Sequence, residues 1–287
     1  MRQCVDTAHI RGAVSLARMP ADGHSAEPMA HVADDDLRRA LTLPAYPRSA
    51  HWDPRWMLEN VMGPNPLWLA EAIAPALALA PGMHVLDLGC GRALSSIFLA
   101  AEFGVRVWAA DLWIDAAENL GRIRAAGREG DVVPVHAEAH ALPFSEGEFD
   151  AIVSLDAYHY FGTDDLYVGY LSRFLRPGGR LGIVSPGVTR EIEEPPAPLR
   201  PYWEWAFCSF HSPDWWRRHW AKTGQVEVEV ADVLPDGWRH WLAWSDVCAR
   251  AGVGMPGAAA REAAMLREDA GRLLGFVRVV GRRPEDA

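Results

Sequence analysis

The sequence predicts a doubly wound α/β fold, in which helices cover both faces of a mainly parallel sheet. Between residues 84 and 187, short apolar runs typical of buried strands alternate with single helical patterns. One helix between successive strands favours parallel pairing through right-handed crossovers. The composition agrees with one or two soluble globular domains, because 49% of the 287 residues are hydrophobic and 23% are charged.

The part of the chain before the first strand has two predicted regions. Residues 1–40 are mostly small, polar and aperiodic, so we expect a flexible tail there. Helices are expected over residues 41–80, with breaks at Gly63-Pro64 and at Pro66. We expect this helical segment to fold across a bound ligand as a lid.

The alternating part follows, with helix ends that are marked by glycine and proline. Gly104 ends the first helix, Thr163 caps the third, and the sequence Pro177-Gly178-Gly179 ends it. Strands are predicted over 84–90, 105–112, 132–139, 149–157 and 180–187, and helices over 93–104, 115–127 and 163–179.

The last hundred residues predict two further strands among helices. Residues 225–234 alternate strictly between polar and apolar, as a half-buried strand does, and 276–283 are the other strand. These two strands would complete an antiparallel pair at the edge of the sheet. Helices are predicted over 213–224, 236–252 and 258–275.

Charge and cysteine content exclude several classes of protein. The formal net charge is −10 and no segment is strongly basic, so a nucleic-acid partner is not expected. The four cysteines are far apart and form no CxxC pair, which argues against a zinc site or a secreted disulfide scaffold and favours the cytoplasm. We find no signal-peptide pattern, no apolar run of about 20 residues and no His–carboxylate cluster, so neither membrane nor metal is expected.

The stretch "HVLDLGCGRALSSIF" combines a strand, a glycine turn and a helix. A dinucleotide fingerprint needs a third glycine, but Leu94 occupies that position after Gly89 and Gly91. Asp87 lies two residues before Gly89, where it would repel a pyrophosphate and accept a hydrogen bond from an ammonium group. The turn therefore favours a ligand that carries a cation.

Two acidic residues follow the next two strands. Asp111 stands 22 residues after Gly89 and can accept hydrogen bonds from both hydroxyls of a ribose. The alternative is that Asp111 caps helix 115–127, a role that Asp115 can also fill. Glu138 can accept from an adenine amine, and the Ala139 N–H can donate to a ring nitrogen.

Four stretches resemble the successive motifs of the class I S-adenosylmethionine-dependent methyltransferases: "VLDLGCG", "AADLW", "AEAHALPF…FDAIVS" and "FLRPGGRLGIV". The resemblance covers about residues 50–230. Within that family the sequence is most similar to the small-molecule group of ubiquinone/menaquinone biosynthesis, sarcosine and phosphoethanolamine methyltransferases. It implies a Rossmann-like methyltransferase fold, whose seven-stranded, mostly parallel sheet has an antiparallel last strand.

The resemblance also implies an activity and a division of the chain. The activity is in-line methyl transfer from S-adenosylmethionine to a nitrogen, oxygen or carbon atom of a small molecule, with S-adenosylhomocysteine as product. Residues 81–287 would form the methyltransferase domain, with segments near 188–211 and 235–272 covering the substrate. Tail and lid would precede this domain.

Site residues are carried over position by position. Glu138 departs from the family, which more often has Asp there, and Ala93 stands where a third small glycine is common. The resemblance implies that Asp87, Gly89 and Gly91 hold the methionine end of the cofactor, and that Ser154 or Leu155 contacts this end through the backbone. It implies that Asp111 holds the ribose. It further implies that Leu112 and Trp113 face the adenine, and that Glu138 and Ala139 bind the edge of the adenine ring.

The acceptor site is expected just after the fourth strand and on two aromatic segments. His159 has a reference pKa suited to a general base, although it can instead pack against the cofactor or cap a helix. The tryptophans at 215, 216 and 220 have helical spacing and are expected in the core. The catalytic candidates are His159, Tyr158 and Asp156, and the substrate-binding candidates are His51, Trp52, Tyr160, Trp203 and Trp205.

Two other functions stay open at this point. A protein of the same fold can bind S-adenosylmethionine without transferring methyl, as a cyclase, a hydrolase-like enzyme or a binding subunit. A nicotinamide oxidoreductase is disfavoured by Leu94. The sequence leaves the acceptor unidentified and allows a monomer or a homodimer.

Overall fold

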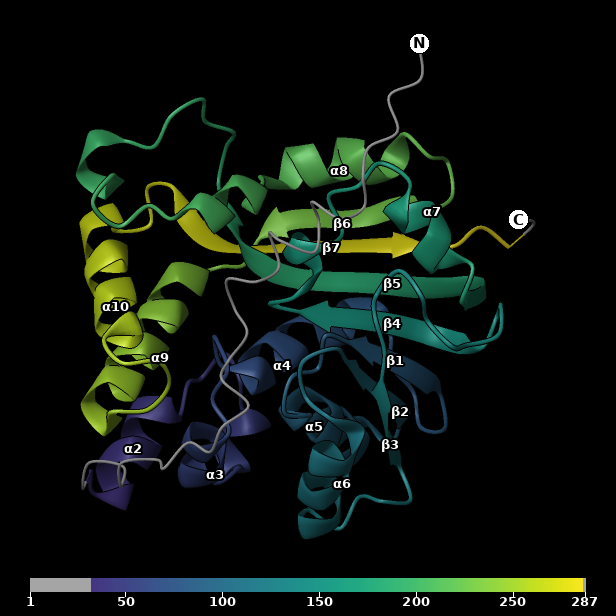
Figure 1. The fold of residues 1–287 in the computed structure, drawn as a ribbon, viewed down its shortest axis with the longest axis horizontal. Coiled ribbons are helices and arrows are strands. Elements are labelled where there is room, and N and C mark those ends of the chain that lie inside the picture. The colour runs from purple at the N-terminus through teal and green to yellow at the C-terminus, as the bar shows by residue number, and fades with distance from the viewer. Residues whose placement is uncertain (1–31, 286–287) are drawn as a thin grey trace.

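A computed structural model describes residues 32–285 of the chain. Seven strands form one sheet in the order β3-β2-β1-β4-β5-β7-β6, with helices on both of its faces (Figure 1). The strands are β1 (His84–Leu88), β2 (Arg106–Asp111), β3 (Val132–His136), β4 (Phe149–Leu155), β5 (Leu175–Val188), β6 (Glu227–Val233) and β7 (Leu274–Arg282). The expected fold class is confirmed.

The helices fall between these strands and before the first. The α-helices are α2 (Asp34–Leu41), α3 (Pro54–Glu59), α4 (Pro66–Leu77), α5 (Leu94–Phe103), α6 (Ala116–Ala125), α7 (Tyr167–Ser172), α8 (Pro213–Ala221), α9 (Gly237–Ala251) and α10 (Ala258–Asp269). Short 3-10 helices are η2 (Ser49–His51), η3 (Tyr158–Tyr160), η4 (Ala197–Leu199) and η5 (Trp205–Ser209).

The topology sets the place of the site. Strands β1 to β5 pair in parallel, and β1 lies between β2 and β4, so the chain reverses its direction of winding between β1 and β4. In doubly wound sheets, ligands bind outside the carboxyl ends of the strands at such a reversal. Strand β7 pairs antiparallel with both β5 and β6, which confirms the antiparallel pair expected from the last two strands.

Alternation along the strands divides the core into two layers. Val85 of β1 belongs to the layer that includes residues of α4, α5 and α9, whereas the next residue, Leu86, belongs to the layer of α7 and α8. Trp216 and Trp220 of α8 are fully buried in the second layer, as the helical spacing predicted, whereas Trp215 is only partly buried against it. Both faces of the sheet are therefore covered.

Helix α4 is a core helix, and in this respect the expected lid over 41–80 is wrong. Its Asn65 cap accepts hydrogen bonds from the first backbone amides, and Pro66 starts the helix. A Cβ on Gly182 of β5 would lie 2.7 Å from Ile73 Cδ1 of α4, so helix and strand are in close contact. Residues packed this tightly on the sheet cannot swing open without exposing the core.

The expected tail is also corrected where it is described. Residues 34–40 belong to helix α2, whose Leu37 and Leu41 are buried and whose first turn holds three aspartates. Acidic side chains stabilise the amino end of a helix, and the apolar pair packs with α3 and α9. The rest of the expected tail, residues 1–31, lies outside the described residues.

The helix predicted over 163–179 is largely wrong. Only Tyr167–Ser172 is helical, and no side chain caps its start. Strand β5 already begins at Leu175, where the pairing with β4 shifts register, and the Gly178 amide donates to the Arg283 carbonyl. Pairing across the sheet therefore prevails over the helical pattern. The other predicted elements are present, with their ends displaced by a few residues.

Candidate functional site

The glycine turn after β1 lies at the reversal of the sheet. Gly89 and Gly91 have φ values of 75° and 54°, a left-handed backbone that favours glycine. The amides of Gly89 and Cys90 both donate to the Ala110 carbonyl of β2. A Cβ on Gly89 would lie 2.4 Å from the Cβ of Ala157, so the turn needs glycine to fit against the segment after β4.

Asp87 presents an unpaired carboxylate oxygen beside this turn. The residue is fully buried, and its Oδ2 accepts hydrogen bonds of 2.6 Å from the hydroxyls of Ser95 and Ser96. Its Oδ1 is buried and has no hydrogen-bond partner within residues 32–285. Burial raises the pKa of Asp87 to about 6, despite the two serine hydroxyls. An ammonium group at Oδ1 would satisfy both the lone pair and the charge.

Asp111 holds the turn and the loop after β2 together. Its Oδ2 accepts from the Gly91 amide at 2.8 Å, and its Oδ1 accepts from the amides of Trp113 and Ile114 at 2.7 and 2.9 Å. Helix α6 is capped by Asp115 instead. A carboxylate has about four acceptor positions, so one remains for a ligand hydroxyl, and a bidentate contact requires one of the three amides to turn away.

Of the residues that are expected to contact the adenine, one pair is exposed to solvent and the other pair forms hydrogen bonds with neighbouring residues. Leu112 and Trp113 are exposed, and the Trp113 ring lies 6.3 Å from that of Tyr160. Both oxygens of Glu138 contact His140, one its amide and one its ring, each at 2.8 Å. The Ala139 carbonyl accepts from the Tyr167 hydroxyl. Each oxygen of Glu138 therefore keeps one acceptor position, which is available to an adenine amine.

Ser154 and Leu155 end β4 beside the turn. The buried Ser154 hydroxyl donates to the Leu88 carbonyl at 2.7 Å and so ties β4 to β1. Leu155 is buried as well. Directly after them, Asp156 adopts a left-handed backbone with a φ of 54°, which is uncommon for a residue with a side chain.

The three residues of η3 point to different surroundings. Tyr158 is fully buried, with its ring centroid 5.6 Å from those of both Trp216 and Trp220, so the structure places it in the core rather than at the site. His159 is 2% exposed, and burial lowers its pKa to about 3. Such an imidazole stays neutral and is a poor proton acceptor at neutral pH. Tyr160 is exposed.

The aromatic substrate candidates are not brought together. Trp52 donates its indole N–H to Glu102 in the last turn of α5, whereas the glycine turn precedes the first turn of that helix. Trp52 and its exposed neighbour His51 therefore lie at the opposite end of α5 from the turn. Trp203 packs against Phe207, and Trp205 is largely exposed.

Residues 59–63 approach the turn instead, and they belong to the segment 41–80 that was expected to fold across a bound ligand. A Cβ on Gly91 would lie 3.0 Å from Met62 Sδ, and Arg92 donates to the Glu59 carbonyl. The Gly63 carbonyl accepts from the Trp244 indole of α9 at 2.7 Å. The break at Gly63-Pro64 was the available signal. Helices α9 and α10 pack together at the end of the sheet to which β4 points (Figure 1).

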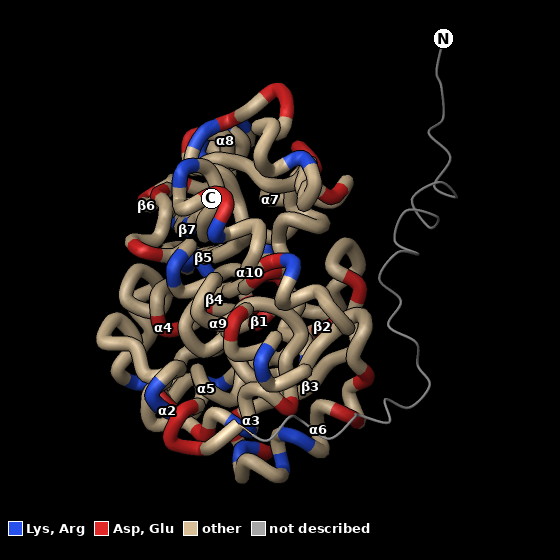
Figure 2. The backbone as a smooth tube through the Cα atoms, turned by 90° about the vertical axis from the view of Figure 1, so that its left-hand side faces the viewer, with Lys and Arg blue, Asp and Glu red and all other residues tan. Residues whose placement is uncertain are grey.

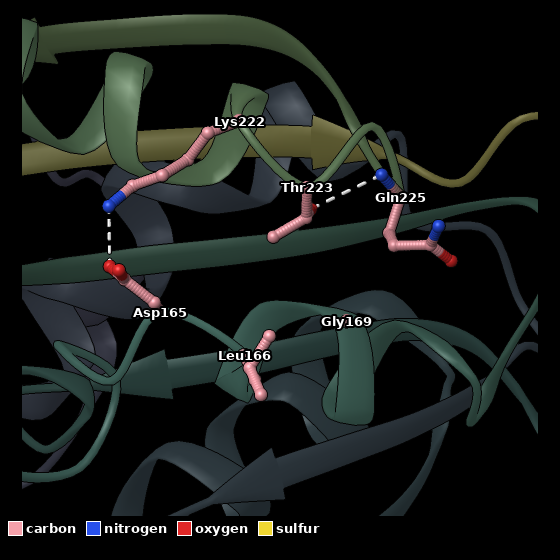
Figure 3. A pocket seen from close by; sticks show the side chains of 6 residues that line it. All are labelled: Asp165, Leu166, Gly169, Lys222, Thr223 and Gln225. Atoms are coloured by element: carbon pink, nitrogen blue, oxygen red, sulfur yellow. Dashed lines mark hydrogen bonds and ion pairs between the residues drawn. The ribbon is translucent and has the colours of Figure 1, made fainter. Parts of the chain in front are cut away.

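A shallow hollow elsewhere is closed by its own contacts. It has a volume of about 430 Å³ and lies between α7 and the end of α8 (Figure 3). Lys222 pairs with Asp165 across it, and the Gln225 amide donates to Thr223. Because these polar groups satisfy one another, we assign no ligand to this hollow.

Along the backbone tube of Figure 2, Lys and Arg positions are interspersed with Asp and Glu positions. In the part of the chain that the structure describes, no helix is both long and apolar enough to cross a membrane. Residues 32–285 also contain no group of three His, Cys, Asp or Glu side chains arranged to hold a metal ion.

Comparison with known proteins agrees with this geometry. Residues 85–179 match the family described as "Methyltransferase domain". A demethylmenaquinone methyltransferase of Mycobacterium sp. (strain KMS) is 35% identical over 125 residues, which are 42% of this chain and 48% of that protein. The chain thus matches about half the length of such relatives.

Two solved structures share the fold. The phosphoethanolamine N-methyltransferase 2 of Haemonchus contortus, in complex with S-adenosyl-L-methionine, has a TM-score of 0.65 and 18% identity, covering 89% of this chain and 61% of that one. A cyclase, SpnF, has a TM-score of 0.60 and 18% identity, covering 75% and 79%. At these identities the likeness concerns the fold alone.

The sheet order, the glycine turn and the matched domain together define a nucleotide-binding α/β domain of the methyltransferase type. The match over residues 85–179 supports a methyltransferase domain of the class I S-adenosylmethionine-dependent type, with S-adenosylmethionine as its cofactor. The resemblance that the sequence motifs carried is confirmed. This finding also argues against the nicotinamide oxidoreductase.

Proposed function

We propose that this protein transfers the methyl group of S-adenosylmethionine to a nitrogen, oxygen or carbon atom of a small molecule. S-Adenosylhomocysteine is the second product. The observation that carries the proposal is the buried, unpaired Oδ1 of Asp87 beside the left-handed turn of Gly89 and Gly91. An anionic ligand would be repelled by that oxygen, whereas an ammonium group would offset its charge and donate a hydrogen bond to it.

The residues fit this cofactor at each of its parts. Asp87 would accept from the ammonium group, and Gly89 and Gly91 would let the backbone approach the methionine end, near Ser154 and Leu155. The remaining acceptor position of Asp111 would take a ribose hydroxyl. The adenine ring would contact four residues, which are Leu112, Trp113, Glu138 and Ala139.

The contribution of the chain to catalysis is mainly to align the acceptor atom with the methyl group, rather than to supply charge. When bound, the sulfonium supplies an electrophilic methyl group, so the protein must hold the acceptor atom in line with it. Alignment of two reactants is worth about 7–11 kcal/mol in the best intramolecular cases. Residues 59–63, held by Trp244, cover the turn and would exclude water from the reacting groups.

We retain Asp156 from the catalytic candidates and Tyr160 from the substrate-binding candidates as acceptor contacts. Asp156 is adjacent to Ala157, which packs against Gly89. The ring of His159 is tilted by 40° against that of Tyr160, with centroids 4.0 Å apart, and its lowered pKa favours a role in orienting that ring over proton removal. Tyr158 serves the core in this proposal.

Calorimetric titration with S-adenosylmethionine and with NAD tests the cofactor. We expect the protein to bind S-adenosylmethionine and not to bind NAD. Asp111→Ala should abolish that binding because it removes the acceptor that holds both the turn and the ribose, whereas the exposed Asp131→Ala should leave it unchanged. Binding of NAD without S-adenosylmethionine would overturn the proposal, and unchanged affinity of Asp111→Ala would overturn the ribose assignment.

The second candidate is a protein of this fold that binds the cofactor without transferring methyl. The shared fold with the cyclase SpnF favours keeping it. Formation of S-adenosylhomocysteine with a panel of small acceptors distinguishes the two functions, since the non-transferring protein would form none. We further propose a cytoplasmic location, with no nucleic-acid or membrane partner. Sedimentation would distinguish monomer from homodimer.

A further inference from the structure

A chain of hydrogen bonds runs from the glycine turn to residues 59–63, which we name the cover segment. The Gly91 carbonyl accepts from Asn119 Nδ2 at 2.9 Å, and Asn119 Oδ1 accepts from Arg122 Nη1 at 3.0 Å. Arg122 Nε in turn donates to Asn60 Oδ1 at 3.1 Å. Two side chains of α6 therefore join the turn to the cover segment.

The backbone of Gly91 is held at both its amide and its carbonyl. The amide donates to Asp111 Oδ2 at 2.8 Å, and the carbonyl accepts from Asn119. Asn119 is 1% exposed, so water does not compete for its hydrogen bonds. Helix α6 therefore fixes the direction in which the turn presents its backbone to a ligand.

Arg122 is suited to join three groups at once. Its three side-chain nitrogens donate separately to Asn60, Asn119 and Glu118, at 3.1, 3.0 and 3.3 Å. Asn60 donates to the Trp56 carbonyl at 2.8 Å, which keeps its amide oxygen turned toward Arg122. A planar guanidinium serves several acceptors in fixed directions, whereas a lysine ammonium has a single nitrogen. The connection thus depends on the shape of the guanidinium as well as on its charge.

The cover segment also contacts the proposed cofactor site directly. A Cβ on Gly91 would lie 3.0 Å from Met62 Sδ, and a Cβ on Gly63 would lie 2.2 Å from Oδ2 of Asp156, which follows β4. The segment therefore lies against the loops that follow β1 and β4. A cofactor whose methionine end is held by the turn would consequently lie beside Met62.

The position of the cover segment leaves one buried donor unsatisfied. Arg92 Nη1 donates to the Glu59 carbonyl at 3.2 Å, but Arg92 Nε is buried and has no hydrogen-bond partner within residues 32–285. A buried donor without an acceptor costs free energy. Because displacement of the segment would admit water to this guanidinium, the closed position depends on the hydrogen bonds that Arg122 supplies.

We propose that Asn119 and Arg122 are positioning residues that keep the cover segment closed over the glycine turn while the cofactor is bound. The inference rests on the proposed function and adds to it the residues that control release of the cofactor. Neither residue contacts the ligand in this proposal. Loss of Arg122 should free the cover segment and leave the cofactor contacts of Asp87 and Asp111 in place.

The test measures how fast the full chain releases radiolabelled S-adenosylhomocysteine when an excess of unlabelled compound is added. R122M is expected to raise the dissociation rate about tenfold, because it removes the charged hydrogen bonds to Asn60 and Asn119. R122K should behave like R122M, since one nitrogen cannot replace the guanidinium. The control is R124M, which removes an exposed arginine from the same helix and should leave the rate unchanged. Equal rates for R122M and R124M would overturn the proposal.

A double-mutant cycle assigns the effect to the contact between α6 and the cover segment. N60L removes the partner of Arg122 on the cover segment and should also raise the dissociation rate about tenfold. The variant with both N60L and R122M should release the ligand no faster than either single variant, because both break the same contact. Two independent structural defects would instead multiply to about a hundredfold, and that result would refute the assignment.

Amide hydrogen exchange separates the causes of failure. S-Adenosylhomocysteine should slow exchange over residues 56–66 in the natural protein and in R124M but not in R122M, whereas exchange over residues 84–92 should slow in all three. Thermal unfolding midpoints show whether R122M destabilises the whole chain, and N60L alone decides if it does. If S-adenosylhomocysteine does not bind, the proposed function fails. Faster exchange over residues 59–63 in ligand-free R122M than in R124M still decides whether Arg122 holds the cover segment.

Discussion

The carboxylate of Asp87 offers the most direct test of the cofactor site. In Asp87→Asn, the amide oxygen can replace Oδ2 and keep the hydrogen bonds from Ser95 and Ser96. The amide nitrogen then takes the place of the unpaired Oδ1. The variant thus removes a buried negative charge without removing a polar group or changing the volume.

The size of the effect follows from the pKa. Burial raises the pKa of Asp87 from 3.8 to about 6. This difference corresponds to about 3 kcal/mol. Because the folded protein holds the proton more tightly than the unfolded chain, this stability is present below about pH 4 and is lost as the pH rises through about 6. Asp87→Asn does not ionise, so it should be more stable than the natural protein by up to about 3 kcal/mol near pH 8.

Urea unfolding of the cofactor-free protein between about pH 4 and pH 8 measures this difference. Calorimetry measures the cost to binding, which we expect to be about tenfold or more, because the charged hydrogen bond to the ammonium group is lost. The control is Asp131→Asn, an exposed carboxylate that pairs with Arg128. It should leave both measurements unchanged.

Two results would refute the reasoning. If Asp87→Asn differs from the natural protein by the same amount at every pH, the carboxylate does not carry an uncompensated buried charge. If the variant binds S-adenosylmethionine as tightly as the natural protein, Oδ1 does not meet the ammonium group.

Two other variants test the turn and His159. Gly89→Ala should lower the free energy of unfolding by more than the about 1–2 kcal/mol that a left-handed backbone costs, because its Cβ would also overlap Ala157. The control Gly121→Ala in α6 has open space and should raise the free energy of unfolding, measured with urea, by about 0.5–1 kcal/mol. Equal effects of the two substitutions would contradict the packing of Gly89 against Ala157. Burial lowers the pKa of His159 to about 3, so the unfolded chain binds the proton more tightly than the folded protein does. The contribution of His159 to the free energy of unfolding is therefore fully present above about pH 6.5, and it falls by up to about 5 kcal/mol as the pH drops toward 3. His159→Phe should remove this pH dependence, and an unchanged profile would show that the imidazole charges freely in the folded protein.

Local sequence patterns were sufficient for the elements that position the cofactor. The glycine turn, the strands on either side of it and the carboxylates Asp87 and Asp111 were all predicted. Backbone geometry explains this success: a left-handed turn needs glycine, and a buried parallel strand needs a continuous apolar run. The polar residue that ends such a strand then faces the ligand edge of the sheet.

The surroundings of the residues after β4 depended on contacts between distant parts of the chain. Tyr158 and Tyr160 stand two residues apart, yet α8 packs on Tyr158 in the core and Tyr160 stays exposed. The helix predicted over 163–179 failed for the same reason, since its last residues, from Leu175 onward, belong to strand β5, which pairs with β4.

The sequence by itself determined the class of fold, the glycine turn and the family, because each depends on the local preferences of the backbone and on the spacing of a few residues. Only the tertiary structure decided which side chains lie beside the glycine turn and which are buried elsewhere. It placed Met62 against Gly91 and Tyr158 in the core. It also placed Trp52 at the far end of α5, because side-chain packing over long distances leaves no periodic mark in the chain.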